Sequence, residues 1–250
     1  MKQSITTLSR ILIICLPLAA FIGVRIISTY IFTVKRHAFT FDSYLAPSVG
    51  ASIEHLVRSD PAVIKQSYKQ LCDRLQKEFP CIDTIKVQFV APGTLHLDIS
   101  TAQPLLAINN THIVTAAQTL ISRTFFYPYH TQFLPSITVT SQALEDPYQK
   151  SELATSAPSM SRICKNYAVQ WLDSTRIILT HKEYPAFSVL CSSTTLPHDT
   201  LLAECHKLEQ KHAQALGTGP GNKTPKTYVA DVRFNKQIIM FSTQGGTVYG

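Results

Sequence analysis

The sequence predicts an α+β protein with a single N-terminal transmembrane helix, a β-α-α-β-β domain, and then a β-rich domain with one or two helices. Three observations support this fold class. Residues 11–24 (ILIICLPLAAFIGV) carry no charge. The stretch VQFVAPGTLHLDIS (87–100) alternates apolar and polar residues around a turn, which is typical of a β-hairpin. After Pro104, short strand-forming runs recur almost to the C-terminus.

The N-terminal segment predicts a cytoplasmic head at 1–10 and a transmembrane helix at 11–33, which meets the requirement of about 20 residues for crossing a bilayer. Arg25 would lie toward the outer half, with Tyr30 and Phe32 at the outer interface. The alternative is a cleaved secretory signal, but no small-residue cleavage site follows Ala20. We therefore expect a single-pass protein of the cell (inner) membrane, with its bulk extracytoplasmic.

The formal net charge of +7 is distributed unevenly. Five of the excess positive charges lie in residues 1–41, and the first acid is Asp42. A protein that binds nucleic acid would carry its basic excess on the folded part. We therefore expect no nucleic-acid partner.

The first folded domain is predicted over residues 37–104. A short strand at 38–44 places Phe39 and Phe41 on one face. An amphipathic helix follows, and a second begins at the N-cap Asp60 and ends before Pro80. The apolar stripe of the first helix is Val49, Ile53, Leu56 and Val57; that of the second is Ile64, Tyr68, Leu71 and Leu75. The hairpin then turns at Ala91-Pro92-Gly93 and completes a small α+β unit.

The second domain is predicted over 105–241, followed by a flexible tail at 242–250. Polar residues 141–160 read as a loop with a broken helix that continues toward Tyr167, residues 197–216 as a helix, and 217–226 as a flexible loop. The predicted strands occupy 105–108, 112–115, 119–126, 136–140, 175–181, 186–191, 227–234 and 236–241.

Catalytic and metal-binding signatures are weak throughout. The loop GTGPGNKT (217–224) does not match a phosphate loop, because its residue spacing differs from that motif and because it follows a predicted helix. Cys205, His206 and His212 lack a second ligand pair, and His96 with Asp98 lacks a nucleophile. We therefore predict no enzyme, no cofactor, no metal and no small-molecule substrate, and keep an enzyme using Cys205 or His96 as the least favoured alternative.

Cysteine placement leaves the redox state open. Five cysteines lie outside the apolar segment, and only a helix end separates Cys72 from Cys81. This pair is the candidate for a disulfide; buried free thiols are the alternative.

The order of these features resembles the FtsQ/DivIB cell-division family, whose first folded module is a POTRA domain. The sharpest local match is FPCIDTIKVQFVAPGTLHLDISTAQPLLAI (79–108), where Pro80, Pro92, Thr94, Leu95 and Pro104 occupy the family's positions. FLPSITV (133–139) and VADVRFNKQIIMF (229–241) are similar to segments of the family's β domain. Gln103 departs from the usual acid, and Cys191-Ser192 stands where Leu-Gly is frequent.

The resemblance implies a non-catalytic scaffold of the divisome at the division septum. Its β domain would bind FtsB/FtsL-like (DivIC-like) proteins, partly by pairing an edge strand with the partner. The matching contact residues are Arg233, Phe234, Lys236, Gln237, Ile238 and Ile239. The competing interpretation of Phe234, Ile238 and Ile239 is that they are core residues. A secreted POTRA-type binding or transport module, released by signal cleavage, is the alternative function.

Overall fold

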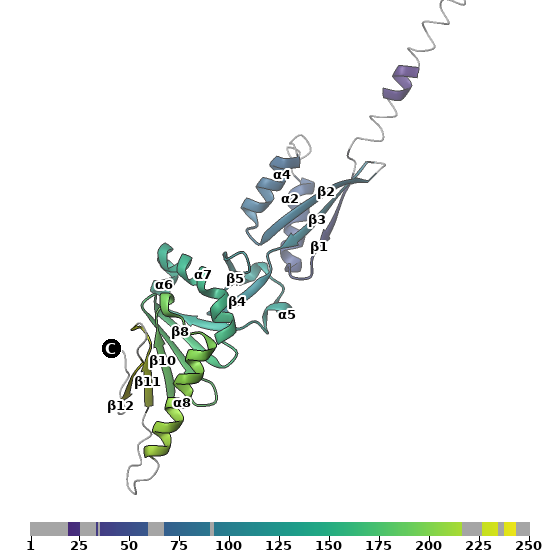
Figure 1. Cartoon of the computed structure of the whole chain (residues 1–250). Coiled ribbons are helices and arrows are strands. Elements are labelled where there is room, and N and C mark those ends of the chain that lie inside the picture. The colour runs from purple at the N-terminus through teal and green to yellow at the C-terminus, as the bar shows by residue number, and fades with distance from the viewer. Residues whose placement is uncertain are drawn as a thin grey trace, which may run out of the picture. The chain divides into compact units, whose positions relative to one another are not determined.

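The computed structural model describes residues 20–25, 34, 36–59, 68–90, 93–216, 227–234 and 238–243 (Figure 1). The described residues fall into two compact units, and the boundary in the sequence lies between Thr101 and Ala102. The prediction had placed this boundary after Pro104.

The first unit contains a three-stranded sheet with the strand order β1-β3-β2. Strands β2 (Ile82–Val90) and β3 (Thr94–Thr101) form the predicted antiparallel hairpin, in which Val87 lies opposite Leu97. The turn ends at Gly93, whose φ of 69° is a conformation that glycine adopts without steric cost. Strand β1 (Arg36–Phe41) pairs in parallel with β3 on its other side.

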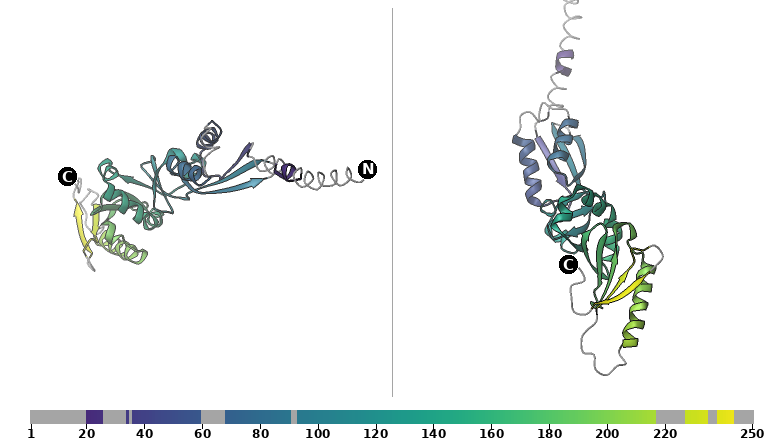
Figure 2. Two further views of the ribbon diagram at one scale, coloured as in Figure 1. Left: turned by 90° about the horizontal axis from the view of Figure 1, so that it is seen from above. Right: turned by 90° about the vertical axis from the view of Figure 1, so that its left-hand side faces the viewer.

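Two helices cover one face of this sheet (Figure 2). Helix α2 (Pro47–Ser59) buries Ile53 and Val57, and α4 (Tyr68–Glu78) buries Leu71 and Leu75, as the helical spacing predicts. They pack against Leu95, Leu97 and Ile99 of β3, which are fully buried. The predicted stripe of the second helix was wrong at Tyr68, whose side chain is exposed; its predicted start at Asp60 and its member Ile64 lie outside the described residues.

The second unit is built on a nine-stranded mixed sheet with the order β12-β11-β10-β9-β8-β7-β4-β5-β6. Strands β4-β7, β7-β8 and β10-β11 pair in parallel, and the remaining neighbours are antiparallel. The strands are β4 (Pro104–Ile108), β5 (His112–Thr115), β6 (Leu120–Ser122), β7 (Ser136–Val139), β8 (Tyr167–Asp173), β9 (Arg176–His181), β10 (Phe187–Cys191), β11 (Thr227–Asp231) and β12 (Ile239–Thr243).

The helices of this unit differ from the prediction between residues 141 and 167. Helix α6 (Ser141–Glu145) is followed by α7 (Pro147–Ile163), a regular helix that Asp146 caps and Pro147 begins. Pro158 lies inside α7 without ending it, on the exposed side of the helix. Tyr167, predicted to extend the helix, instead begins the unpredicted strand β8.

One continuous hydrophobic core holds the second unit together. Helices α7 and α8 (Asp199–Leu216) contribute Met160 and Cys205 to it, and Trp171 of β8, the single tryptophan of the chain, is completely buried. Two short connections complete the unit: α5 (Pro128–Thr131), after the 3₁₀ turn η1 (Arg123–Phe125), and the 3₁₀ turn η2 (Ser193–Thr195) before α8.

The transmembrane part of the predicted fold class is contradicted, and so is the predicted single-pass location in the membrane. Across the residues that the structure describes, no helix combines the length and the apolar character that crossing a bilayer demands. Residues 20–25 are helical, and the rest of the predicted span 11–33 lies outside the described residues. The described fold is α+β with mixed sheets.

Candidate partner-binding edge

Strand β12 ends the nine-stranded sheet. It pairs antiparallel with β11, with Asp231 opposite Ile239, and within the described part of the chain no strand lies on its other side. A terminal strand presents backbone N–H and C=O groups that a further strand can pair with. This edge belongs to the segment in which the sequence predicted partner binding.

The predicted contact residues around β12 face different environments. Ile238 is half-buried and packs against the core, whereas Ile239, the first residue of β12, is 45% exposed. Phe234 is 50% exposed in the connection from β11. The core interpretation therefore fits Ile238 and does not fit Phe234 or Ile239. Lys236 and Gln237 lie outside the described residues.

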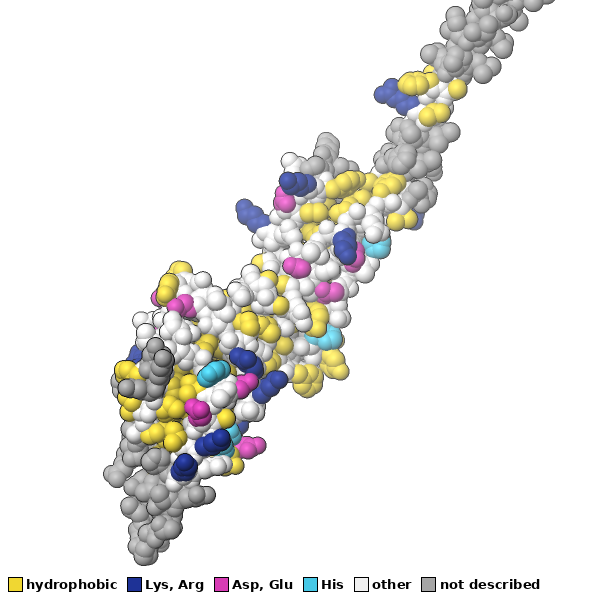
Figure 3. Space-filling view, viewed as in Figure 1, with side chains coloured by type: hydrophobic (Ala, Val, Ile, Leu, Met, Phe, Trp, Pro, Cys, Tyr) yellow, Lys and Arg dark blue, Asp and Glu magenta, His cyan; other side chains and the backbone are white. Residues whose placement is uncertain are grey.

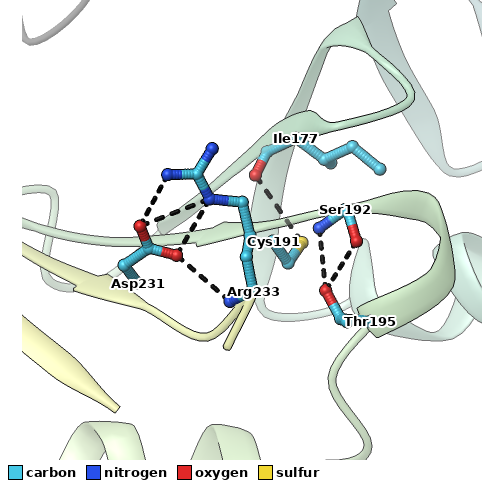
Figure 4. Close-up of polar contacts among 6 residues, drawn as sticks. All are labelled: Ile177, Cys191, Ser192, Thr195, Asp231 and Arg233. Carbon is cyan, nitrogen blue, oxygen red and sulfur yellow. Dashed lines mark hydrogen bonds and ion pairs between the residues drawn. The ribbon is translucent and has the colours of Figure 1, made fainter. Parts of the chain in front are cut away.

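Arg233 is bound to the end of β11. Its Nη2 donates to Asp231 Oδ2 at 2.7 Å, its Nε donates to Oδ1 at 3.0 Å, and its backbone N–H also donates to Oδ1 (Figure 4). Burial acts to raise the pKa of Asp231, but these hydrogen bonds and the guanidinium charge outweigh it and hold the pKa below the ordinary value. The ion pair fixes the direction in which the chain leaves the sheet toward Phe234.

A groove of about 620 Å³ lies beside this connection. Phe234 and Ile238 line one side of it, together with Val232. The other side comes from the residues before α8 and from its first turns, chiefly Leu196, Pro197 and Leu201. The lining is mostly apolar and also includes Glu204 and His198. A groove with this lining can accept side chains of a strand added to β12.

The turn η2 supports the second wall of the groove, which is the side formed by Leu196, Pro197 and Leu201. Ser192 N–H donates to Thr195 Oγ1 at 3.0 Å, and the Ser192 and Thr195 hydroxyls are 2.8 Å apart (Figure 4). Just before it, the Cys191 thiol donates to the carbonyl of Ile177 in β9 at 3.6 Å. The Ser192–Thr195 bonds hold η2 to the residue that follows β10, the Cys191 bond joins β10 to β9, and Leu196 follows η2 at the groove.

Sequence reasoning missed this second wall. Leu196 and Leu201 lie more than thirty residues before Phe234, and only the parallel pairing of β10 with β11 brings the two segments together. Pro197 is a local signal for the start of a helix. It does not indicate which strand lies beside that helix. A contact of this kind depends on the topology of the sheet.

The candidate catalytic residues His96 and Asp98 lie in the first unit, and Cys205 lies in the second. His96 Nε2 lies 2.7 Å from Thr40 Oγ1 on the neighbouring strand β1, and Asp98 lies opposite Lys86 in the hairpin. Cys205 is buried in the core, and His206 stacks on His181 with ring centroids 5.3 Å apart. The side chain of His212 lies outside the described residues. Over the described ranges, no group of three or more His, Cys, Asp or Glu side chains is placed to hold a metal ion.

The candidate disulfide pair, Cys72 and Cys81, is present as two free thiols. Cys81 is completely buried, and this burial raises the pKa of its thiol to about 12. Cys72 is half-buried on α4, and burial together with the nearby Asp73 raises its pKa as well. Both thiols are therefore un-ionised near neutral pH.

No protein-family model matches the chain. No curated protein matches it either.

Proposed function

We propose that this chain is a non-catalytic scaffold of a bacterial division complex, similar to the FtsQ/DivIB proteins, and that it binds an FtsB/FtsL-like partner by adding a strand to β12. The observation that carries the proposal is the position of β12 at the end of the nine-stranded sheet, in the segment whose sequence resembles the family's contact strand.

Strand addition suits the chemistry of this edge. A partner strand would gain main-chain hydrogen bonds along β12, each contributing about 1 kcal/mol net. Selectivity would come from side chains, because Ile239 is exposed on the strand and Phe234 stands exposed at the groove. Burying an apolar side chain of this size contributes about 1.5–3 kcal/mol.

The Asp231–Arg233 pair has a supporting role in the proposal. It anchors the connection in which Phe234 lies, so that the aromatic ring is presented with little loss of conformational freedom on binding. Arg233 would thus act on the partner mainly by positioning Phe234, in addition to any contact of its own.

The experiment uses the full chain and the FtsB-like and FtsL-like proteins of the same organism as probe. Phe234→Ala, Ile239→Asp and Lys236→Glu should each weaken capture of the pair by at least about tenfold. Tyr148→Ala removes another exposed aromatic side chain, on α7, and should leave capture unchanged. Normal capture with both Phe234→Ala and Ile239→Asp would overturn strand addition at β12.

The division role has a separate test. Depletion of the protein should give filaments or unseparated cells, because a division complex without its scaffold cannot complete the septum. Normal septa after depletion would contradict a division role whatever the binding assay shows.

A further inference from the structure

An exposed cluster of aromatic rings lies at α5, several strands away from β12 in the order of the sheet. Tyr127, Tyr129, His130 and Phe133 contact one another through their rings, with centroids 5.4–6.5 Å apart. Tyr129 is 62% exposed and Phe133 is 79% exposed. In Figure 3, hydrophobic side chains project from the surface at the position that α5 occupies in Figure 1. We call these four residues the aromatic cluster.

The backbone beneath the aromatic cluster is firmly held. Phe126 and Thr131 are buried on either side of Tyr129, and Pro128 begins the short helix. The Thr131 hydroxyl donates to the carbonyl of Pro128 at 3.2 Å and accepts from Nε of Arg123 at 3.3 Å. The rings therefore stand on a fixed support, which lowers the entropic cost of binding.

The rings form ridges and not a flat platform. Tyr129 meets Phe133 at an interplanar angle of 89° and His130 at 83°. Rings packed edge to face present their faces in different directions, so a partner meets several exposed aromatic faces and edges. Surfaces lined by aromatic rings are those on which polyproline II segments dock.

The segment around the aromatic cluster carries hydrogen-bond donors but no carboxylate. From Ala102 to Leu144 the chain contains no aspartate or glutamate, and Arg123 is its single charged side chain other than histidines. The phenol groups of Tyr127 and Tyr129 and the ring of His130 can donate hydrogen bonds. No carboxylate in this segment offers a strong acceptor to a partner.

A proline-rich segment has the complementary chemistry. Proline has no N–H to donate, while the carbonyl groups of a polyproline II helix carry no internal hydrogen bonds and remain acceptors. Its pyrrolidine rings pack against aromatic rings, and its extended form loses little entropy on binding. We propose that the aromatic cluster binds a proline-rich, uncharged or acidic segment of a partner protein, independently of strand addition at β12.

The test measures binding of a fluorescent oligoproline peptide of about ten residues to the full chain by fluorescence anisotropy. A glycine-serine peptide of the same length is the control ligand. The chain should bind oligoproline at least about tenfold more tightly than the control, and Tyr129→Ala or Phe133→Ala should remove that preference. Tyr129→Phe keeps the ring but loses the donor, so a partial loss is expected.

Tyr148→Ala is the matched control variant, since Tyr148 is 67% exposed in the same unit and lies outside the aromatic cluster. It should leave oligoproline binding unchanged. Equal binding of the two peptides, or an equal loss with Tyr148→Ala, would overturn the proposal. So would binding to phosphatidylcholine vesicles that depends on Tyr129 while oligoproline is not bound, because the cluster would then recognise a lipid surface.

Discussion

Asp231 accepts hydrogen bonds from both the backbone N–H and the guanidinium of Arg233, two residues further along the chain. The Asp231 side chain is 7% exposed and that of Arg233 is 33% exposed, so the pair closes the end of β11 with a buried carboxylate and a half-buried guanidinium. Phe234 and the groove follow directly, which makes the geometry of the proposed binding edge depend on this contact.

The Asp231–Arg233 pair should make stability depend on pH in the acid range. The pKa of Asp231 lies below its ordinary value, so the pair stabilises the fold above the unfolded pKa of about 3.9. This contribution is lost as the pH falls through the lower folded-state pKa. We expect Asp231→Asn to flatten the decline in the free energy of unfolding on acidification below about pH 4.5, measured by urea unfolding with Trp171 fluorescence.

Asp199→Asn is the control for this measurement. The side chain of Asp199 is 74% exposed, and its distance of 4.0 Å to Arg162 is at the limit for an ion pair. The free energy of unfolding of Asp199→Asn should change with pH by the same amount as that of the wild type. If Asp231→Asn also ran parallel to wild type, the pair would not contribute to acid stability.

The side chain of Asn109, just after β4, forms two hydrogen bonds with the backbone of Val139, the last residue of β7. Its Nδ2 donates to the carbonyl of Val139 at 2.6 Å, and its Oδ1 accepts from the N–H of Val139 at 2.8 Å. Asn109→Ala should lower the free energy of unfolding by about 2 kcal/mol more than Asn110→Ala, since losing hydrogen bonds at a part-buried site leaves backbone groups unsatisfied. Urea unfolding followed by Trp171 fluorescence measures the difference.

Asn110 is a matched control because it shares the positive φ of Asn109. Its φ is 59°, against 49° for Asn109, and its side chain accepts one exposed hydrogen bond from Arg123. Backbone strain from alanine is therefore similar in the two variants. If Asn109→Ala and Asn110→Ala lowered the free energy of unfolding equally, the two hydrogen bonds to Val139 would not contribute to stability.

The buried thiols should resist alkylation in the folded protein. Burial raises the pKa of Cys81 to about 12 and those of Cys164 and Cys205 to about 11, so their reactive thiolate forms are scarce near pH 8. We expect each to react with iodoacetamide at least about a hundredfold more slowly than in denaturant. Among the described cysteines the half-buried Cys72 should react first, as read by peptide mass spectrometry.

The non-reduced sample supplies the control for the disulfide hypothesis. If Cys72 and Cys81 both stayed unlabelled in denaturant until a reductant was added, they would form the predicted disulfide. Labelling of both without reductant would support the free thiols of the structure.

Local patterns predicted the first unit well. The alternation of Val87 and Phe89 with Leu95 and Leu97 is a two-residue period, and the turn at Gly93 needs a residue that tolerates positive φ. Both signals lie within fifteen residues, so no knowledge of distant contacts was necessary.

Errors arose where a local signal was weighed wrongly. Residues 141–160 were predicted as a loop with a broken helix, yet α7 continues through Pro158, which lies on the exposed side, where a helix tolerates a lost backbone bond more easily. The alternation of Tyr167, Val169 and Trp171 is a strand signal that the extension of the helix hid. The groove at β12 could not be predicted in this way, because its two walls meet only through sheet topology.

Gly50 offers a test of how much space surrounds Phe41 in the first unit. A Cβ at Gly50 would lie 3.3 Å from Cε2 and 3.4 Å from Cδ2 of the Phe41 ring, which is tight but not prohibitive. Alanine is favoured over glycine inside a helix by about 0.5–1 kcal/mol. Phe41 is half-buried and, with Gly50, lines a cavity of about 740 Å³, so its ring can shift by a few tenths of an ångström.

We therefore expect Gly50→Ala to raise the free energy of unfolding by about 0.5 kcal/mol, and Gly50→Val to lower it by about 1–3 kcal/mol, because a branched side chain would displace Phe41 further. Urea unfolding followed by far-ultraviolet circular dichroism measures the stability, and hydrogen exchange of α2 peptides localises the change to this helix. A less stable Gly50→Ala would show that the Phe41 ring is held in place and that the cavity does not give it room.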